Sequence, residues 1–330
     1  MLYPLKFKPY MREMIWGGNR LALAGKSVPK GSDPSSIGES WELSGVDGHL
    51  SVASNGFLRN NNIEELIEVY MGELVGDGVY EEYGLEFPLL LKFIDSRDNL
   101  SVQVHPSDEF AAENGGGRGK TEMWYIVETD QGGAIYLDFN RKVGREEYLA
   151  AVADGSVEHL LHKIEVHKGD AFFVPSGTVH AICKGVLIAE IQETSDATYR
   201  IYDWGRVGKD GRPRELHTDL AVQVIEFTPR TDLNVTRNPQ PNTLAELVSC
   251  KYFTVNLVNL RGTIVRDFAP LDSFVAYMCV EGEVQFKMNG EQSRIGALET
   301  VLIPAEACDV ELSGTGRLLE IFVPDTYIAR

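Results

Sequence analysis

The 330-residue chain is short of basic charge, of closely spaced cysteines and of long apolar runs. Its 31 basic and 49 acidic side chains give a formal charge of −18, which argues against a surface for nucleic acid or anionic membranes. No window reaches transmembrane length, and the first residues lack the apolar core of a signal peptide. The four cysteines show no pairing such as C-x2-C, so we expect reduced thiols in a cytoplasmic protein: Cys183, Cys250, Cys279 and Cys308.

What the chain does contain is a set of candidate metal ligands. Gln103 and His105 lie in Gln-Val-His-Pro, Glu122 ends Lys-Thr-Glu, and His180 closes a glycine- and proline-containing tract. Residues two apart on a strand face the same side, so Gln103 and His105 can both point inward. Nitrogen and oxygen ligands of this kind bind a divalent transition metal. If one ion gathers all four side chains, it can act as a Lewis acid in a buried pocket.

The tract before His180 has the most specific local pattern. It reads Gly169-Asp-Ala-Phe-Phe-Val-Pro-Ser-Gly177-Thr-Val-His180. Gly169 opens a turn, the apolar run 171–174 suits a buried strand, and Gly177 can adopt a positive φ in a second turn. A histidine that begins the strand after such a turn can point into the mouth of a barrel. Without this surrounding pattern, a lone histidine would more often be a hydrogen-bonded structural residue.

This pattern resembles the second signature motif of the cupin superfamily, whose fold is a small jelly roll. The first motif of that superfamily usually supplies two histidines, two residues apart, and then a glutamate. Here Gln103 takes the place of the first histidine, and Glu122 follows His105 by 17 residues (122 − 105). The match is therefore good at the second motif and loose at the first.

The departures from the general motif agree with a more particular resemblance. Several features follow one another over roughly the first two-thirds of the chain: the segments 15–18, 38–44, 88–95, 100–106 and 119–125, and then Glu190, Asp196 and Arg200. Together they resemble type I mannose-6-phosphate isomerases, which are zinc-dependent cupin enzymes. The resemblance implies one zinc ion per chain, held by Gln103, His105, Glu122 and His180. It also implies that mannose 6-phosphate and fructose 6-phosphate are interconverted through an enediol.

The same resemblance suggests which residues surround the substrate's reacting carbons. Glu190 is our first choice for the group that carries the proton, although the identity of the base stays open. Arg200 cannot act as a base at physiological pH, and it would instead stabilise the enediolate.

The substrate phosphate needs donors of its own, and three residues are candidates. Ser101 shares the face of Gln103 by the two-residue period, and Lys120 shares the face of Glu122. Arg206 falls where the family has a phosphate-binding lysine, so here the cation is of a different type.

The spacing of apolar residues predicts a mainly β chain. We expect a cupin-type double-stranded β-helix with small helical insertions over residues 1–235, and a second, smaller jelly-roll-like unit over 236–330. Residues 228–243 include three prolines and are expected to form a linker. No histidine follows His217, so we expect no metal in the second unit. Helices are predicted at 63–71, 107–113 and 146–153, and strands at 89–93, 101–104, 123–127, 134–137, 160–166, 171–174, 186–191, 199–202, 252–260, 263–268, 273–280, 284–288, 300–303 and 318–323.

Two other classes of protein are open alternatives. One is a different cupin enzyme, either an iron-dependent oxygenase or another sugar-phosphate isomerase. Gln103 and the cations Lys120, Arg200 and Arg206 disfavour it. The other is a non-catalytic sugar-binding cupin, in which the ligands of the first unit should have been lost. We expect a monomer or homodimer that acts on a small sugar phosphate and binds neither nucleic acid nor membrane.

Overall fold

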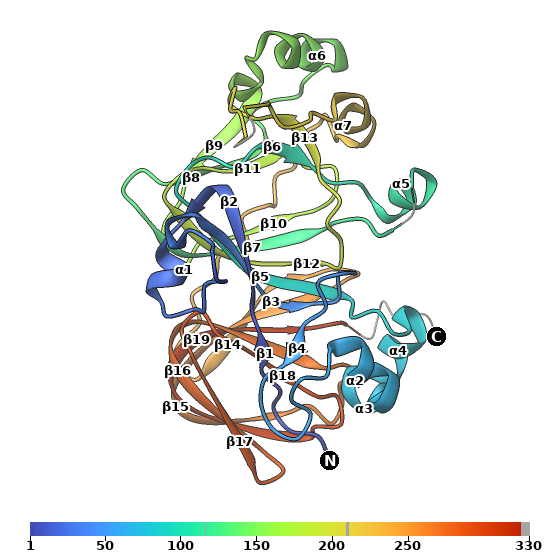
Figure 1. Ribbon diagram of the computed structural model, residues 1–330, viewed down its shortest axis with the longest axis vertical. Coiled ribbons are helices and arrows are strands. Elements are labelled where there is room, and N and C mark those ends of the chain that lie inside the picture. Colours follow the sequence, from blue (N-terminus) through green and yellow to red (C-terminus); the bar gives the residue numbers. More distant parts are fainter. Residues whose placement is uncertain (116, 209–210, 325–330) are drawn as a thin grey trace. The chain divides into compact units, whose positions relative to one another are not determined.

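The computed structural model describes residues 1–115, 117–208 and 211–324, and the chain divides into two compact units. The central unit comprises Met11–Ser40 and Phe93–Val235. The terminal unit comprises Met1–Tyr10, Trp41–Lys92 and Thr236–Arg330. Strands dominate both units, so the mainly β class expected from the sequence is confirmed (Figure 1). The predicted domains, residues 1–235 and 236–330, stay a prediction.

A six-stranded sheet and a five-stranded sheet hold the strands of the central unit, and residues 10, 41–44 and 89–92 of the larger sheet belong to the terminal unit. The larger follows the order β10-β7-β12-β5-β2-β3, and the smaller follows β13-β6-β11-β8-β9. The strands are β2 (Tyr10–Gly18), β3 (Ile37–Ser44), β5 (Leu89–Ser96), β6 (Val102–Val104), β7 (Glu122–Thr129), β8 (Ala134–Phe139), β9 (Leu161–Glu165), β10 (Ala171–Val174), β11 (His180–Ile182), β12 (Val186–Glu193) and β13 (Tyr199–Tyr202). The helices are α1 (Arg20–Leu23), α5 (Asp108–Glu113), α6 (Arg145–Asp154) and α7 (Thr218–Val224), with short 3-10 turns at Pro34–Ser36 and Val157–Leu160.

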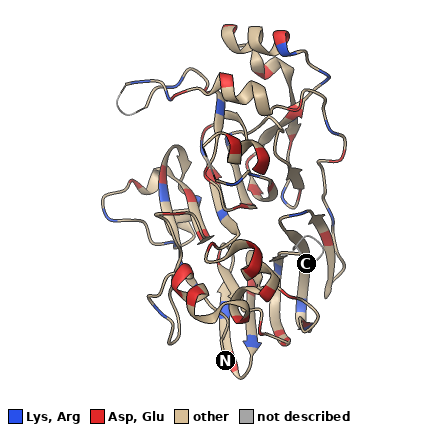
Figure 2. Cartoon of the chain, turned by 90° about the vertical axis from the view of Figure 1, so that its right-hand side faces the viewer, with Lys and Arg blue, Asp and Glu red and all other residues tan. Residues whose placement is uncertain are grey.

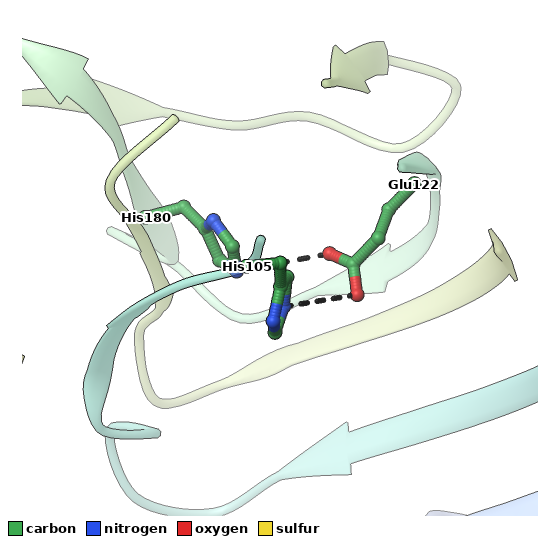
Figure 3. A group of neighbouring side chains, drawn as sticks. All are labelled: His105, Glu122 and His180. Atoms are coloured by element: carbon green, nitrogen blue, oxygen red, sulfur yellow. Dashed lines mark ion pairs between the residues drawn. The ribbon is translucent and has the colours of Figure 1, made fainter. Parts of the chain in front are cut away.

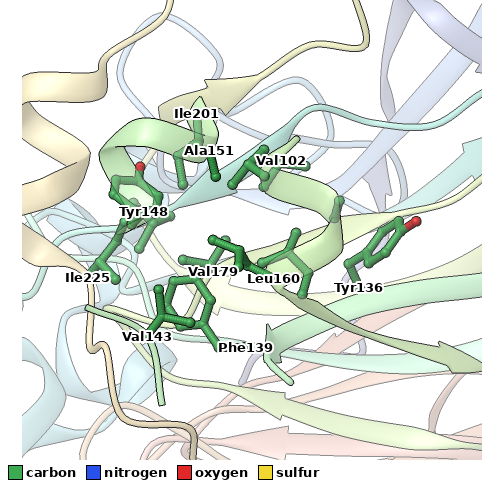
Figure 4. Close-up of a cluster of buried hydrophobic side chains, with 14 of the residues drawn as sticks. Val102, Tyr136, Phe139, Val143, Tyr148, Ala151, Leu160, Val179, Ile201 and Ile225 are labelled. Atoms are coloured by element: carbon green, nitrogen blue, oxygen red, sulfur yellow. The ribbon is translucent and has the colours of Figure 1, made fainter. Parts of the chain in front are cut away.

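Alternating residues of the five-stranded sheet contribute to two different apolar cores. On β8, Ile135 and Leu137 join a cluster with Trp124 and Phe172 of the larger sheet. The intervening Tyr136 points to the other face, where a second cluster includes residues of α6 and α7 (Figure 4). Because successive side chains on a strand face opposite sides, residues that share the parity of Ile135 and Leu137 face the interior between the sheets.

The strands that carry candidate ligands follow the same alternation. Val102 and Val104 of β6 belong to the cluster that contains Tyr136, which we call the outer cluster; the cluster of Ile135 and Leu137 is the inner one. Gln103, between the two valines, therefore faces the interior. On β11, Ala181 lies in the outer cluster and Ile182 in the inner one, which places His180 on the interior side. The sheets therefore direct Gln103 and His180 into the same space.

The terminal unit is built mainly from long antiparallel strands. Its largest sheet follows the order β14-β15-β19-β16-β17, with β18 paired to β16, and β1 pairs with β4. Helix α2 of this unit begins with a capping box between Asn62 and Glu65, whereas the first N–H groups of α4 donate to the side chain of Asp272. The elements are β1 (Phe7–Lys8), β4 (Val52–Ala53), α2 (Ile63–Tyr70), α3 (Gly72–Val75), α4 (Asp77–Tyr83), β14 (Thr243–Ser249), β15 (Thr254–Asp267), β16 (Val275–Met288), β17 (Glu291–Gly296), β18 (Thr300–Ile303) and β19 (Asp309–Phe322).

Most predicted elements are confirmed, and the clearest error concerns strand length in the terminal unit. The strands predicted at 252–260 and 263–268 are one strand, β15, and those predicted at 273–280 and 284–288 are one strand, β16. Gly262 pairs with Gly314 and Gly282 pairs with Gly316 inside continuous ladders. Gly262 and Gly282 have positive φ values of 105° and 80°, so they bend the strands without ending them.

Acidic side chains occur along helices and strands of the chain, in keeping with its net negative charge (Figure 2). Among the described helices, none is both long and apolar enough to cross a membrane.

Helices α4 and α7 were not predicted from the sequence. Each is only seven residues long, which is too short for the apolar period of a helix to be recognised.

Candidate metal centre

Three buried side chains converge in the central unit. His105 follows β6, Glu122 begins β7 and His180 begins β11, and their ligand atoms all lie within 4.8 Å of one another (Figure 3). His105 Nε2 lies 3.3 Å from Glu122 Oε1, and His180 Nε2 lies 3.7 Å from Glu122 Oε2. Each residue is about 1% exposed, so water contributes little to their solvation. Three of the four predicted ligands are thus in place for a common ion.

The backbone fixes the tautomer of both histidines. His105 Nδ1 donates to the carbonyl oxygen of Ala197 at 2.8 Å, and His180 Nδ1 donates to that of Thr178, also at 2.8 Å. A carbonyl oxygen only accepts, so the proton of each neutral ring is on Nδ1 and the lone pair is on Nε2. Burial lowers the pKa of His105 to about 3 and lowers the pKa of His180 as well, which keeps both rings neutral. Both Nε2 lone pairs therefore face Glu122 and are available to a metal ion.

The turn predicted before β11 links the two histidine segments. Gly177 has a φ of 81°, and its N–H donates to the carbonyl oxygen of His105 at 2.9 Å. A side chain there would be strained by this φ, and its Cβ would lie 2.9 Å from the carbonyl oxygen of Val224. The glycine in the motif thus has a physical purpose, which is to hold His105 beside the strand of His180.

Glu122 carries the negative charge of the group. Its Oε1 lies 2.8 Å from Lys120 Nζ. Burial opposes ionisation of the carboxyl group, but the nearby ammonium holds the pKa of Glu122 well below its usual range. Within the described residues, Glu122 Oε2 and His105 Nε2 are buried and have no hydrogen-bond donor. Buried acceptors that face one another without a donor are what a cation satisfies, so this donor set fits a divalent metal.

Gln103 completes the predicted set. It lies directly opposite His180 in the pairing of β6 with β11, and its Nε2 is 3.3 Å from His180 Nε2. A half-turn of the amide about its last bond would bring Oε1 to the same place, and that oxygen is the atom that binds a metal. Ser101 lies on the same face, with Oγ 3.5 Å from Gln103 Oε1. The predicted shared faces, Ser101 with Gln103 and Lys120 with Glu122, both occur in the structure.

Arg200 lies next to this group on β13, opposite Gln103 in the ladder with β6. Its Nη1 donates to the carbonyl oxygen of Glu215 at 2.8 Å, and its backbone N–H donates to His217 Nδ1 at 3.0 Å. Its Nε is buried and finds no acceptor among the described residues. The guanidinium is thus anchored at one nitrogen and retains donors for another partner.

A pair of arginines shares one buried carboxylate near Arg200 in sequence. Arg206 donates to Asp203 Oδ1 at 2.5 Å and to the carbonyl oxygen of Asn99, and Arg214 donates to both oxygens of Asp203 at 2.8 and 2.6 Å. Although burial disfavours the carboxylate, these hydrogen bonds lower the pKa of Asp203. Sequence reasoning selected Arg206 but missed Arg214 and Asp203. The only available signal was the density of arginine between residues 200 and 214.

Glu190 lies deeper along the same face as Glu122. On β12, Gln192 is opposite Glu122 and Glu190 is opposite Trp124. Trp124 Nε1 donates to Glu190 Oε2 at 2.8 Å, and the indole packs edge-on against the ring of His180 with a centroid distance of 5.3 Å. The indole of Trp124 therefore lies in contact with both Glu190 and His180, and it links the carboxylate to the candidate ligand group.

The barrel of paired sheets and the buried histidine–glutamate group define a cupin. Residues 4–140 match the family described as phosphomannose isomerase type I, catalytic domain, and residues 243–323 match the one described as mannose-6-phosphate isomerase, cupin domain. The chain belongs to the type I phosphomannose isomerase family, which confirms the resemblance seen in the sequence. The first match includes Gln103, His105 and Glu122, whereas His180 and Arg200 lie beyond it.

Individual relatives agree with this assignment. The chain is 37% identical over 286 residues to mannose-6-phosphate isomerase ManA of Bacillus subtilis, which covers 85% of this chain and 86% of that protein. It is 35% identical over 307 residues to the mannose-6-phosphate isomerase of Streptococcus mutans, with 92% and 93% covered. The solved mannose 6-phosphate isomerase from Bacillus subtilis superposes with a TM-score of 0.86 at 32% identity, over 97% of this chain and 99% of that one.

Proposed function

We propose that this protein interconverts mannose 6-phosphate and fructose 6-phosphate in the cytoplasm, as a monomer or homodimer. Relatives at 37% and 35% identity carry the name of this isomerase, and the reaction class that the family implies is aldose–ketose isomerisation. The observation that carries the proposal is the buried convergence of His105, Glu122 and His180 within 4.8 Å.

We propose that one zinc ion per chain is held by His105 Nε2, His180 Nε2, a carboxylate oxygen of Glu122 and the amide oxygen of Gln103. One carboxylate among three neutral ligands leaves a net positive charge on such a centre. A divalent cation bound there would stabilise the negative charge that develops on the C1 and C2 oxygens of the substrate. The two Nε2 lone pairs that face Glu122 support this assignment.

The chain's own groups would carry the proton between C2 and C1. Glu190 remains our candidate, because its carboxylate lies on the face of Glu122, two residue pairs along the ladder. The hydrogen bond from Trp124 to Oε2 fixes its orientation. Arg200 would donate to the enediolate through the guanidinium nitrogens that Glu215 does not occupy.

Ser101, Lys120 and Arg206 are proposed as donors to the substrate phosphate. Lys120 uses one donor on Glu122, and its ammonium has three. Arg206 is held by Asp203, which Arg214 shares, so we add Arg214 as a further cation near the phosphate. A guanidinium held at one edge by a carboxylate keeps a rigid orientation toward an anion.

The test is a coupled assay with mannose 6-phosphate on purified protein, before chelation, after chelation and after zinc is returned. We expect activity to disappear with the metal and to return with it. No turnover in the zinc-loaded protein would refute the function, and turnover that persists without metal would refute the role of the ion.

The roles of the arginines predict a split between kinetic constants. Arg200→Ala should lower mainly kcat, because the enediolate forms only in the transition state. Arg206→Ala should mainly raise KM, because the phosphate is bound equally in the ground state. Steady-state kinetics on both variants checks this, and the reverse pattern would exchange the two roles.

A further inference from the structure

A pair of acidic side chains lies outside the ligand group, and one of the two is buried. Glu193 ends β12 and is 2% exposed, and its side chain is hydrogen-bonded to that of Asp108 in the first turn of α5. A carboxylate has no proton to donate, so two carboxyl groups can share a hydrogen bond only when one of them is protonated. The contact between Glu193 and Asp108 therefore requires a proton on one of the two carboxyl groups.

The surroundings decide which acid carries the proton. Each acid accepts one backbone N–H, from Gly119 at Asp108 Oδ1 (2.9 Å) and from Thr121 at Glu193 Oε1 (2.7 Å), but only Glu193 is fully buried, so its charged form is disfavoured more strongly. Glu193 is buried beside that charge, and burial together with Asp108 raises the pKa of Glu193 to about 8. Other charged groups on the neighbouring elements are Glu109 on α5, Lys120 and Glu122 at the start of β7, and Asp196 after β12.

Glu193 holds the backbone of Thr121, the residue between Lys120 and Glu122, through both its N–H and its carbonyl group. The N–H of Thr121 donates to Glu193 Oε1 at 2.7 Å, and the N–H of Glu193 donates to the carbonyl oxygen of Thr121 at 3.3 Å. Since neighbouring residues of an extended chain face opposite sides, fixing Thr121 on one side directs Lys120 and Glu122 to the other.

The acid pair also closes the long segment between the two ligands of the first motif. Asp108 and Gly119 are joined by the carboxylate, and the N–H of Lys120 donates to the carbonyl oxygen of Pro106 at 3.0 Å. Thirteen residues separate Pro106 from Lys120 (120 − 106 − 1), so without these links the segment would leave Glu122 loosely placed.

We propose that Glu193 and Asp108 share one proton and form a positioning pair that sets Lys120 and Glu122 at the metal centre. The shared proton stands independently of the proposed function, whereas the positioning role rests on Glu122 being a metal ligand. Neither acid is one of the proposed ligands or substrate-binding residues, so the pair acts through the backbone at Thr121 and Gly119.

The first test looks for the proton in the metal-free protein. The infrared difference between the protein and its Glu193→Gln variant should contain a carboxylic acid C=O band at neutral pH. That band should disappear as the pH rises through about 8. Glu128→Gln, an exposed change on β7, should give no such band. Absence of the band in the Glu193→Gln difference would overturn the shared proton.

The second test measures zinc affinity by competition with a chromophoric chelator. Glu193→Gln can still accept from Thr121 and donate to Asp108, so its affinity should stay close to that of the unchanged protein. Glu193→Ala loses both hydrogen bonds and should bind zinc about tenfold to a hundredfold more weakly. Unchanged affinity in Glu193→Ala, or equal losses in both variants, would overturn the positioning role. A protein that shows the band and these affinities but no isomerase activity would refute the proposed function and leave this pair standing.

Discussion

Two buried carboxylates, one in each unit, show how the same residue type serves different ends. Glu320 of the terminal unit accepts two hydrogen bonds from Arg266 at 2.9 Å each, one from Tyr277 at 2.5 Å and one from Asn256 at 3.1 Å. Glu122 of the central unit meets Lys120 at 2.8 Å on one oxygen. Within the described residues, its other oxygen has no donor and lies 3.7 Å from the Nε2 lone pair of His180.

The two carboxylates differ in how many of their oxygen lone pairs accept hydrogen bonds from the chain. Every lone pair that Glu320 needs to share finds a donor on its own chain, so this carboxylate stabilises the fold and has little capacity for a ligand. Around Glu122, acceptors face acceptors, and that arrangement costs free energy until a cation enters. Burial alone therefore does not indicate a functional carboxylate. A better indicator is a buried carboxylate whose neighbouring acceptors lack hydrogen-bond donors.

Loss of a histidine ligand should give the largest effect and would test the active half of the comparison. In His180→Asn the imidazole Nε2 is gone, so bound zinc should be lost and kcat/KM should fall by about a thousandfold. The coupled isomerase assay and the zinc content of the same sample measure both. His162→Asn, on β9, is the matched control and should behave like the unchanged protein. Nearly full activity in His180→Asn would remove the contrast with Glu320.

The structural half of the comparison predicts the opposite outcome for Glu320→Gln. This change leaves the half-buried guanidinium of Arg266 without its counter-charge, so the free energy of unfolding should fall by about 3 kcal/mol. The folded variant should retain its isomerase activity. Urea denaturation followed by circular dichroism gives the stability, with the exposed Glu246→Gln on β14 as control. A loss of activity without a loss of stability would show that the terminal unit does more than fold.

Zinc itself should distinguish the two carboxylates. At a free concentration a hundred times its dissociation constant, zinc should stabilise the protein by about 2.7 kcal/mol, because it binds only the folded state. Glu320→Gln should gain the same increment from its lower starting point, and His180→Asn should gain none. Thermal unfolding with and without zinc measures the increments. An equal gain in all three proteins would indicate a metal site elsewhere.

The acid pair adds a smaller, pH-dependent contrast. Burial and Asp108 raise the pKa of Glu193 to about 8 from 4.5, so between these values the folded protein keeps a proton that the unfolded chain has released. The stability from this group is complete below pH 4.5 and is lost as the pH rises to about 8. The metal-free protein should lose up to about 1.4 kcal/mol per pH unit relative to Glu193→Gln in this range. Denaturation at several pH values checks it; parallel curves would contradict the shared proton.

The sequence predicted those features that depend on local pattern. The strand at Ala171–Val174, the turn at Gly177 and the inward face of Gln103 follow from turn residues and from the two-residue period, and the structure has all of them. The family resemblance supplied the order of the ligands. The roles assigned to Glu190, Arg200 and the phosphate donors stay predictions.

Features that depend on contacts between distant segments were not predictable. Asp203 binds Arg214, which lies eleven residues later (214 − 203), and no spacing in the sequence signals that contact. Glu193 meets Asp108 across 85 residues (193 − 108). The glycines within β15 and β16 have the same local pattern as turns, and only pairing with glycines of β19 makes them bends in continuous strands.

The Gly177 turn has a consequence for how this site can vary by mutation. Its N–H donates to the carbonyl oxygen of His105, and the turn runs directly into β11, which begins at His180, so one residue governs the spacing of two histidines that are 75 residues apart in sequence (180 − 105). A single substitution at Gly177 would therefore displace both histidines at once. A second substitution elsewhere would have to restore a hydrogen bond that is made by the backbone and that no side chain provides.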